Sequence, residues 1–127
     1  MKNTLTHRLK SSLFSFLFFI AFASFGQVTW DGSTDSNWND GTNWDTGAVP
    51  TTTDDVLIPN TTNQPNINAG TSAFAQNIWV FSNASLTIQA GATLTIDDGV
   101  GGIINSGTLT NSGHIKIGLN TLVIGDG

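Results

Sequence analysis

The carboxy-terminal half of the chain alternates apolar and polar residues in short, similar units. The two clearest repeats are 84–88 (ASLTI) with 92–96 (ATLTI), and 105–109 (NSGTL) with 111–115 (NSGHI). Shorter apolar pairs at 115–117 and 122–124 continue the pattern. An apolar side chain at every second position predicts a short strand with one buried face. We therefore expect short strands throughout this half of the chain.

The spacing of these units favours parallel stacking over hairpins. A hairpin meander needs strands of alternating direction joined by type I′ or II′ turns, whereas these units are similar in sense and six to nine residues apart. Three units would make one coil of about 20 residues, with Gly and Asn at the corners. We predict an all-β protein built as a parallel β-helix, or β-solenoid. An antiparallel sandwich is the alternative.

The amino-terminal segment has the three parts of a secretory signal peptide. Three of the four Lys and Arg residues lie in the first ten positions, an apolar run follows over 13–22, and mostly small residues occupy 23–26. A run of about ten residues is too short to span a bilayer, which takes about 20. We predict a signal peptide over 1–26, cleaved after Gly26 or else after Ala23, with no membrane insertion afterwards. A membrane anchor is the alternative.

Residues 27–65 form a second region, rich in Trp, Asp and turn residues. Short strands are expected at Val28–Trp30 and Val56–Ile58, where β-branched residues are bounded by Gly, Pro and Asn. We divide the mature chain into a cap region over 27–65 and solenoid repeats over 66–127. Because an uncapped solenoid end exposes strand edges, we expect this chain to be the amino-terminal part of a longer protein.

The charge of the mature chain excludes several kinds of partner, and its lack of Cys excludes disulfides as a source of stability. The mature chain after the leader contains one Lys and nine Asp, with no Glu and no Arg, so its formal charge is −8. Binding to phosphate needs clustered Lys and Arg, so neither nucleic acid nor an anionic membrane is an expected partner. The chain has no Cys, so its stability must come from backbone ladders, calcium or a longer stack instead of disulfides.

The motifs of the cap region carry a family resemblance. They are Thr29-Trp30-Asp31-Gly32, Asn37-Trp38, Asn43-Trp44, Val49-Pro50 and Asp54-Asp55-Val56-Leu57-Ile58-Pro59. With the repeats over 86–124, they make the chain resemble the opening of large repeat-containing surface proteins of Gram-negative bacteria. Many of those are exported by the type IX secretion system, and others are similar to autotransporter β-helix adhesins. The resemblance implies a Trp-rich cap followed by a right-handed β-helix, secreted or held at the outer cell surface.

Four carboxylates of the cap region suggest calcium as a cofactor. They are Asp31, Asp35, Asp40 and Asp45, and we call them the acidic cluster. Oxygen ligands in a flexible loop suit this ion. An EF-hand register fails, because Gly41 comes one place late and Thr46 stands where Glu is needed. The alternative is that these side chains bind their own backbone in Asx turns.

The Trp residues have two possible uses. The chain holds Trp30, Trp38, Trp44 and Trp79. Trp38 and Trp44 are candidates for stacking against a glycan. The alternative is that three of the four fill the end of the first coil, because Trp buries a large apolar area.

No arrangement of residues indicates catalysis. Asp97 and Asp98 follow a strand, but neighbouring carboxylates at a Gly-flanked corner are usually solvated, and a paired-carboxylate mechanism needs a set separation. The alternation of Ile115 and Ile117 places His114 on the solvent side. We therefore expect no catalytic residues.

These observations predict an exported, non-enzymatic β-solenoid protein that acts as an adhesin or structural spacer. The expected partner is an extracellular polysaccharide, a matrix or a host surface. Two alternatives stay open: the start of a carbohydrate-active β-helix lyase or hydrolase, and a small glycan-binding module. The sequence indicates no cofactor apart from calcium and does not determine the oligomeric state.

Overall fold

The computed structural model describes residues 26–97, 102–118 and 123–125, so the predicted signal peptide lies outside it except for Gly26. Within these residues the chain forms strands and one short 3-10 turn, and no α-helix. The elements are β1 (Gln27–Thr29), η1 (Gly41–Asn43), β2 (Asp55–Ile58), β3 (Asn66–Ile67), β4 (Ser72–Ala75), β5 (Asn77–Val80), β6 (Ser85–Ile88), β7 (Thr93–Ile96), β8 (Ile103–Asn105), β9 (Thr108–Asn111), β10 (His114–Ile117) and β11 (Val123–Gly125). The prediction of an all-β protein is confirmed.

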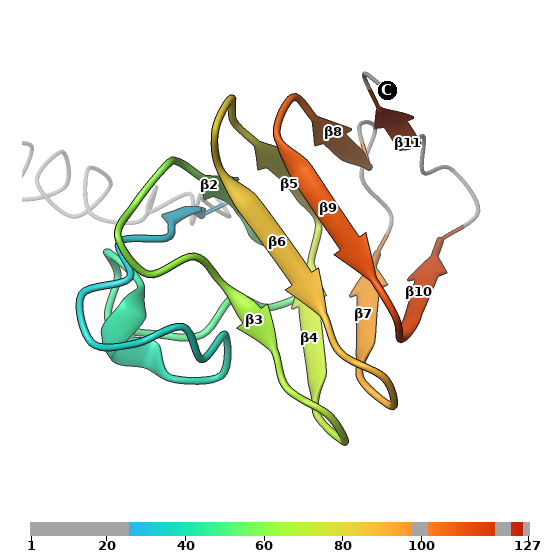
Figure 1. Ribbon diagram of the computed structural model, residues 1–127, viewed down its shortest axis with the longest axis horizontal. Helices are drawn as coiled ribbons and strands as arrows, with labels where there is room; N and C mark the ends of the chain where they lie inside the picture. Colours follow the sequence, from blue (N-terminus) through green and yellow to red (C-terminus); the bar gives the residue numbers. More distant parts are fainter. Residues whose placement is uncertain (1–25, 98–101, 119–122, 126–127) are drawn as a thin grey trace, which may run out of the picture.

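The strands form three sheets. From β2 onward each sheet takes every third strand, and β1 lies beside β2 at the edge of the first sheet. Their orders are β1-β2-β5-β8-β11, β3-β6-β9 and β4-β7-β10. Figure 1 shows the chain passing through the three sheets in turn, so that strands three positions apart lie side by side. Among the described strands all eight pairings are parallel. The antiparallel sandwich is therefore wrong for this part of the chain.

In the sheet of β4, β7 and β10 the register repeats at a constant interval. Ser72 pairs with Thr93, and Thr93 pairs with His114, a spacing of 21 residues in both steps. The next position along each strand brings Ala73, Leu94 and Ile115 into one row. The expected spacing of about 20 residues between stacked strands is therefore present.

Alternation within each strand separates the core from the surface. In β6 and β7 the burial pattern is the same, with Leu86, Ile88, Leu94 and Ile96 fully buried and the Ser and Thr between them half-buried. The buried apolar side chains of all three sheets form one cluster. Burying one such side chain contributes about 1.5–3 kcal/mol, so this shared interior holds the sheets together.

The repeated Asn-Ser-Gly motif makes two equivalent corners. The backbone N–H of Gly107 donates to Asn105 Oδ1 over 3.2 Å, and that of Gly113 donates to Asn111 Oδ1 over 3.0 Å. A Cβ atom at Gly107 would come closer than 3.0 Å to the carbonyl oxygens of Phe81 and Ala84. The repeat therefore keeps Gly because the corner lies against the backbone of the preceding corner.

The cap region and the repeats share a sheet. The strands expected at Val28–Trp30 and Val56–Ile58 appear as β1 and β2, within one residue of their predicted bounds. Both belong to the sheet that contains β5 and β8. A boundary at residue 65 therefore divides strands that are hydrogen-bonded neighbours. No helix in the described residues is long and apolar enough to cross a membrane.

Candidate functional site

Three of the four Trp side chains form a buried cluster. The rings of Trp30 and Trp44 meet edge to face with centroids 4.9 Å apart, and those of Trp38 and Trp44 do so at 4.7 Å. Trp30 Nε1 donates to the carbonyl of Asn63 over 2.7 Å, and Trp44 Nε1 donates to the carbonyl of Trp38 over 2.8 Å. Edge-to-face packing is a favoured geometry for aromatic rings. These Trp side chains therefore contribute to the core.

The glycan-stacking prediction for Trp38 and Trp44 does not fit this burial. Trp38 is 0 % exposed and Trp44 is 2 % exposed, whereas stacking against a sugar needs an open ring face. Both residues instead fit the alternative, in which Trp side chains fill the end of the first coil. A glycan site must therefore be sought on another part of the surface.

The loop over residues 31–45, which we call the cap loop, covers one end of two sheets. Trp38 N donates to the carbonyl of Asn66 in β3, and Asn66 N donates to the carbonyl of Ser36. Asn39 Nδ2 donates to the carbonyl of Ser72, the first residue of β4. These bonds satisfy part of the backbone at the edges of β3 and β4, where a bare strand invites pairing with another chain.

Each carboxylate of the acidic cluster accepts a hydrogen bond from a backbone N–H. Asp31, Asp35 and Asp40 accept from the residue two positions later, at 2.7–2.9 Å, and Asp45 accepts from Thr29 at 2.8 Å. The first three bonds are Asx turns, the alternative raised from the sequence. In the described part of the chain, no three His, Cys, Asp or Glu side chains lie close enough together to hold a metal ion. Calcium binding stays a prediction.

Asp40 also caps the short 3-10 turn η1. Its carboxylate accepts from Thr42 Oγ1 over 2.7 Å and from Thr42 N over 2.9 Å. The hydroxyl donor and then the backbone donor favour the charged form, so the pKa of Asp40 lies below its ordinary value of 3.8. The carboxylate therefore acts as a local backbone acceptor that begins the turn.

Asn43 is the polar centre of the cap loop, and the sequence did not single it out as such. It is fully buried, and its Oδ1 accepts from the backbone N–H groups of Thr34 and Asp35, each over 2.9 Å. Its Nδ2 donates to Asp35 Oδ1 over 2.7 Å and to the carbonyl of Asn37 over 3.0 Å. One side chain thus joins the stretch 34–37 of the loop to η1, and only the folded loop brings those partners together.

The remaining sequence candidates lie at the surface. Asp97 is exposed, and Asp98 lies outside the described residues. His114 and Lys116 are exposed on β10, as the alternation with Ile115 predicted. Ile117, which the same alternation placed inside, is also exposed, at 44 %. Nothing in the positions of these residues indicates a reaction.

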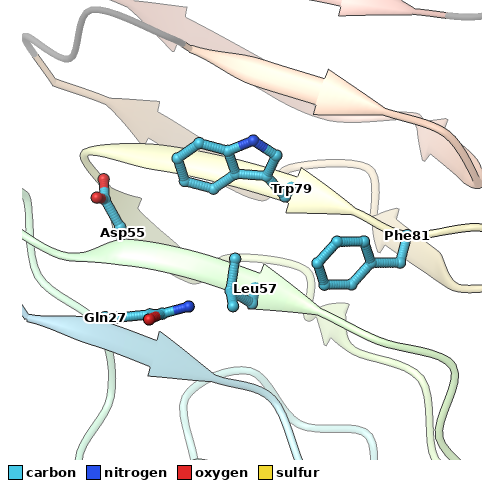
Figure 2. A pocket seen from close by; sticks show the side chains of 5 residues that line it. All are labelled: Gln27, Asp55, Leu57, Trp79 and Phe81. Atoms are coloured by element: carbon cyan, nitrogen blue, oxygen red, sulfur yellow. The ribbon is translucent and has the colours of Figure 1, made fainter.

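An open groove of about 550 Å³ lies on the outer face of the five-stranded sheet. It is lined by Gln27 of β1, Asp55 and Leu57 of β2, Trp79 of β5 and Phe81, just after β5. Figure 2 shows Gln27 and Asp55 at one end and Phe81 at the other, with Leu57 and Trp79 between them. The volume is in the range of small-ligand sites, about 300–1,000 Å³.

The alternation of residues 77–80 already indicates that Trp79 lies on the outer face of its strand. Residues 77–80 alternate, and Ile78 and Val80 are buried at 0 % and 1 % exposed. Strict alternation then places Trp79 on the outer face. The neighbours of Trp79 in the groove come from β1 and β2, which are 22 or more residues earlier, so the groove itself is not visible in the sequence.

The polar end of the groove is ordered by a row of side chains. Asn77 Nδ2 donates to Asp55 Oδ1 over 2.7 Å, and Asn77 Oδ1 accepts from the N–H of Gly102 over 2.8 Å. Asp55 and Asn77 are direct neighbours in the parallel pairing of β2 and β5. The Asp55 carboxylate is therefore held in one orientation on strands that the core fixes.

The described residues thus define an all-β protein of parallel strands, with a buried Trp cluster at one end and an aromatic groove on one outer face. The chain belongs to the family described as domain of unknown function DUF8693, whose model matches residues 29–117. The matched range includes the acidic cluster and every groove residue except Gln27. No curated protein and no solved structure matches the chain.

Proposed function

We propose that this chain is an exported, non-enzymatic β-solenoid protein that acts as an adhesin or structural spacer outside the cell. The observation that carries the proposal is the pairing, from β2 onward, of each strand with the strand three positions later, in parallel. A chain that turns through three strands and returns to its own previous turn builds a solenoid most simply, and the family resemblance implies a right-handed one. The proposal includes calcium binding by the acidic cluster and export by the type IX route.

A solenoid suits a spacer because its length grows with the number of coils. Each coil of about 21 residues adds the distance between neighbouring strands, about 4.8 Å, to the stack. Every coil contacts only its neighbours, so the stack has no size limit set by a closed core. The cap loop supports this reading, because its bonds to β3 and β4 protect the starting edges of two sheets.

The composition supports a location outside the cell. The amino-terminal pattern of basic, apolar and small residues is that of a secretory leader. The mature surface is acidic and rich in Thr, Asn and Ser, with one Lys. Such a surface stays soluble by charge repulsion and avoids nucleic acid and anionic lipid.

Cell fractionation tests the proposed location. The chain is produced in its native bacterium or in a Gram-negative host with the matching secretion pathway, and an antibody against residues 26–118 is applied to intact cells and to medium. We expect surface labelling that added protease removes, or accumulation in the medium. A product confined to the cytoplasm with its leader uncut would refute export.

Disulfide trapping tests the solenoid in solution. The chain has no Cys, so a Thr95→Cys, Lys116→Cys pair can form only one intramolecular bond. These residues are direct partners in β7 and β10, and neighbouring strands lie about 4.8 Å apart, inside the Cα range for a disulfide. The control pairs Thr95→Cys with His114→Cys, two positions out of register. Equal oxidation of the two pairs would contradict the register.

A further inference from the structure

We infer that the groove on the outer face of β1, β2 and β5 binds a neutral polysaccharide, with Trp79 as the platform against which a sugar ring packs. This inference names a site and a ligand class within the proposed function, and it depends on that function only for the extracellular setting. The argument uses the exposure of the apolar side chains, the ordered carboxylate and the charge of the surroundings.

The apolar part of the groove is a surface that the core does not use. Trp79 points away from the interior, between the buried Ile78 and Val80, and Phe81 is 44 % exposed. Figure 2 shows both rings together with Leu57 along one side of the sheet. The C–H face of a hexose is apolar and matches the face of an aromatic ring, and Trp offers the largest such face together with a polar N–H. The groove therefore presents the kind of surface on which sugars pack.

The polar part of the groove can bind hydroxyl groups. Asp55 uses one carboxylate oxygen for Asn77, and its other oxygen is an acceptor for which no bond is seen among the described residues. The Gln27 side chain supplies both a donor and an acceptor. A few ordered polar groups beside an apolar surface are the usual composition of a ligand site. Their position at one end of the groove gives a bound chain a direction along β2 and β5.

Charge selects among extracellular polysaccharides. Among the described residues that line the groove there is one carboxylate and no cation, and Lys116 lies on β10 in another sheet. An anionic chain of uronate or sulfated sugars would meet repulsion from Asp55 without any pairing Lys or Arg. A chain of uncharged hexoses meets no such cost. The ligand class that fits is therefore a neutral polysaccharide.

Two other occupants fit the groove less well. A peptide that binds by strand addition needs a free sheet edge. β2 and β5 each have a parallel neighbour on both sides. At the outer edge of β1, the N–H and the carbonyl of Thr29 are already bonded to Asp45. A stable protein interface takes about 20–30 residues on each side, whereas five of the described residues line the groove. A sugar chain needs neither a free edge nor a large area.

The test is a titration of the purified full-length mature chain with cellohexaose and laminarihexaose, two neutral glucose chains. Trp30, Trp38 and Trp44 are buried, so a saturable change in Trp emission reports on Trp79. We expect millimolar or tighter binding to at least one probe. Because Trp79→Ala removes the fluorescent reporter, the affinities of the variants are measured by isothermal titration calorimetry. Trp79→Ala should weaken binding by about tenfold or more, and Phe81→Ala should weaken it by a smaller factor.

The matched control is Phe74→Ala, which removes a 39 % exposed aromatic residue from β4 in another sheet and should leave binding unchanged. Circular dichroism and urea unfolding establish that each variant is folded. If Trp79→Ala does not fold, Phe81→Ala provides the test. The inference is overturned if neither glucan saturates at millimolar concentration, or if binding survives both groove substitutions. It is also overturned if polygalacturonate, an anionic chain, binds the groove more tightly than either glucan. The same holds if the protein proves to be a dimer that the groove substitutions abolish. Failure of export in cells would leave this result unchanged.

Discussion

Replacing Asn43 by Ala removes the polar centre of the cap loop and tests what holds the loop together. The Asn43 side chain makes four hydrogen bonds, and three of their partners are backbone groups. The fourth partner is the carboxylate Asp35 Oδ1. Ala keeps the backbone of η1 but leaves these groups without the buried side chain that satisfies them.

The size of the effect follows from the number and kind of these bonds. A neutral hydrogen bond contributes about 1 kcal/mol net, and a bond to a charged group about 1.5–3 kcal/mol. Water can reach some of the partners, because Thr34 and Asp35 are exposed. We therefore expect Asn43→Ala to lower the free energy of unfolding by about 3 kcal/mol. That is a large part of the 5–15 kcal/mol typical of a domain.

The assay is equilibrium unfolding in urea, followed by Trp fluorescence and by circular dichroism. For a loss of about 3 kcal/mol, the midpoint should fall by roughly 1–3 M urea. Asn60→Ala, the same exchange at an exposed loop position, is the control and should change the midpoint little. A change smaller than about 1 kcal/mol for Asn43→Ala would refute the reasoning. The Trp cluster alone would then hold the loop.

Three further outcomes are expected. Gly107→Ala should cost about 1–3 kcal/mol in urea unfolding, because its Cβ would meet two backbone carbonyls, whereas Gly125→Ala, with open space around it, should be neutral. The carboxyl of Asp40 should titrate below pH 3.8 by NMR, and Thr42→Val should move its pKa towards 3.8. The stability that this carboxylate adds is present above pH 3.8 and is lost as the pH falls through the lower, folded-state pKa. An unchanged pKa in the Thr42 variant would contradict the hydroxyl's role. A higher melting temperature in calcium than in chelator would support a calcium site in the acidic cluster, and equal temperatures would remove it.

Local pattern was sufficient for the strands with regular alternation. The segments 84–88 and 92–96 were expected as strands and appear as β6 and β7. Their inward Leu and Ile residues are buried as the period of two requires. The same rule placed His114 on the surface of β10. These predictions succeeded because side-chain direction in a strand depends only on position along that strand.

The roles of the cap residues could not be predicted from residue type. Trp38 and Trp44 were considered as sugar-binding residues and lie in the core. Trp79, which the same pattern rule places outside, lines the groove. A Trp side chain suits a core and a binding surface equally well by its chemistry. Its use depends on whether other segments cover it, and that is decided by contacts between residues far apart in the chain.

By itself, the sequence determined the short strands, the Gly and Asn corners and the acidic, cation-poor surface, because each follows from local periodicity, backbone preference or composition. Only the tertiary structure decided which strands pair and what lies between them. The groove joins residues from Gln27 to Phe81, and Asn43 joins segments of the cap loop. The physical reason is that parallel register is set when side chains about 21 residues apart pack in one interior. No single strand contains that information.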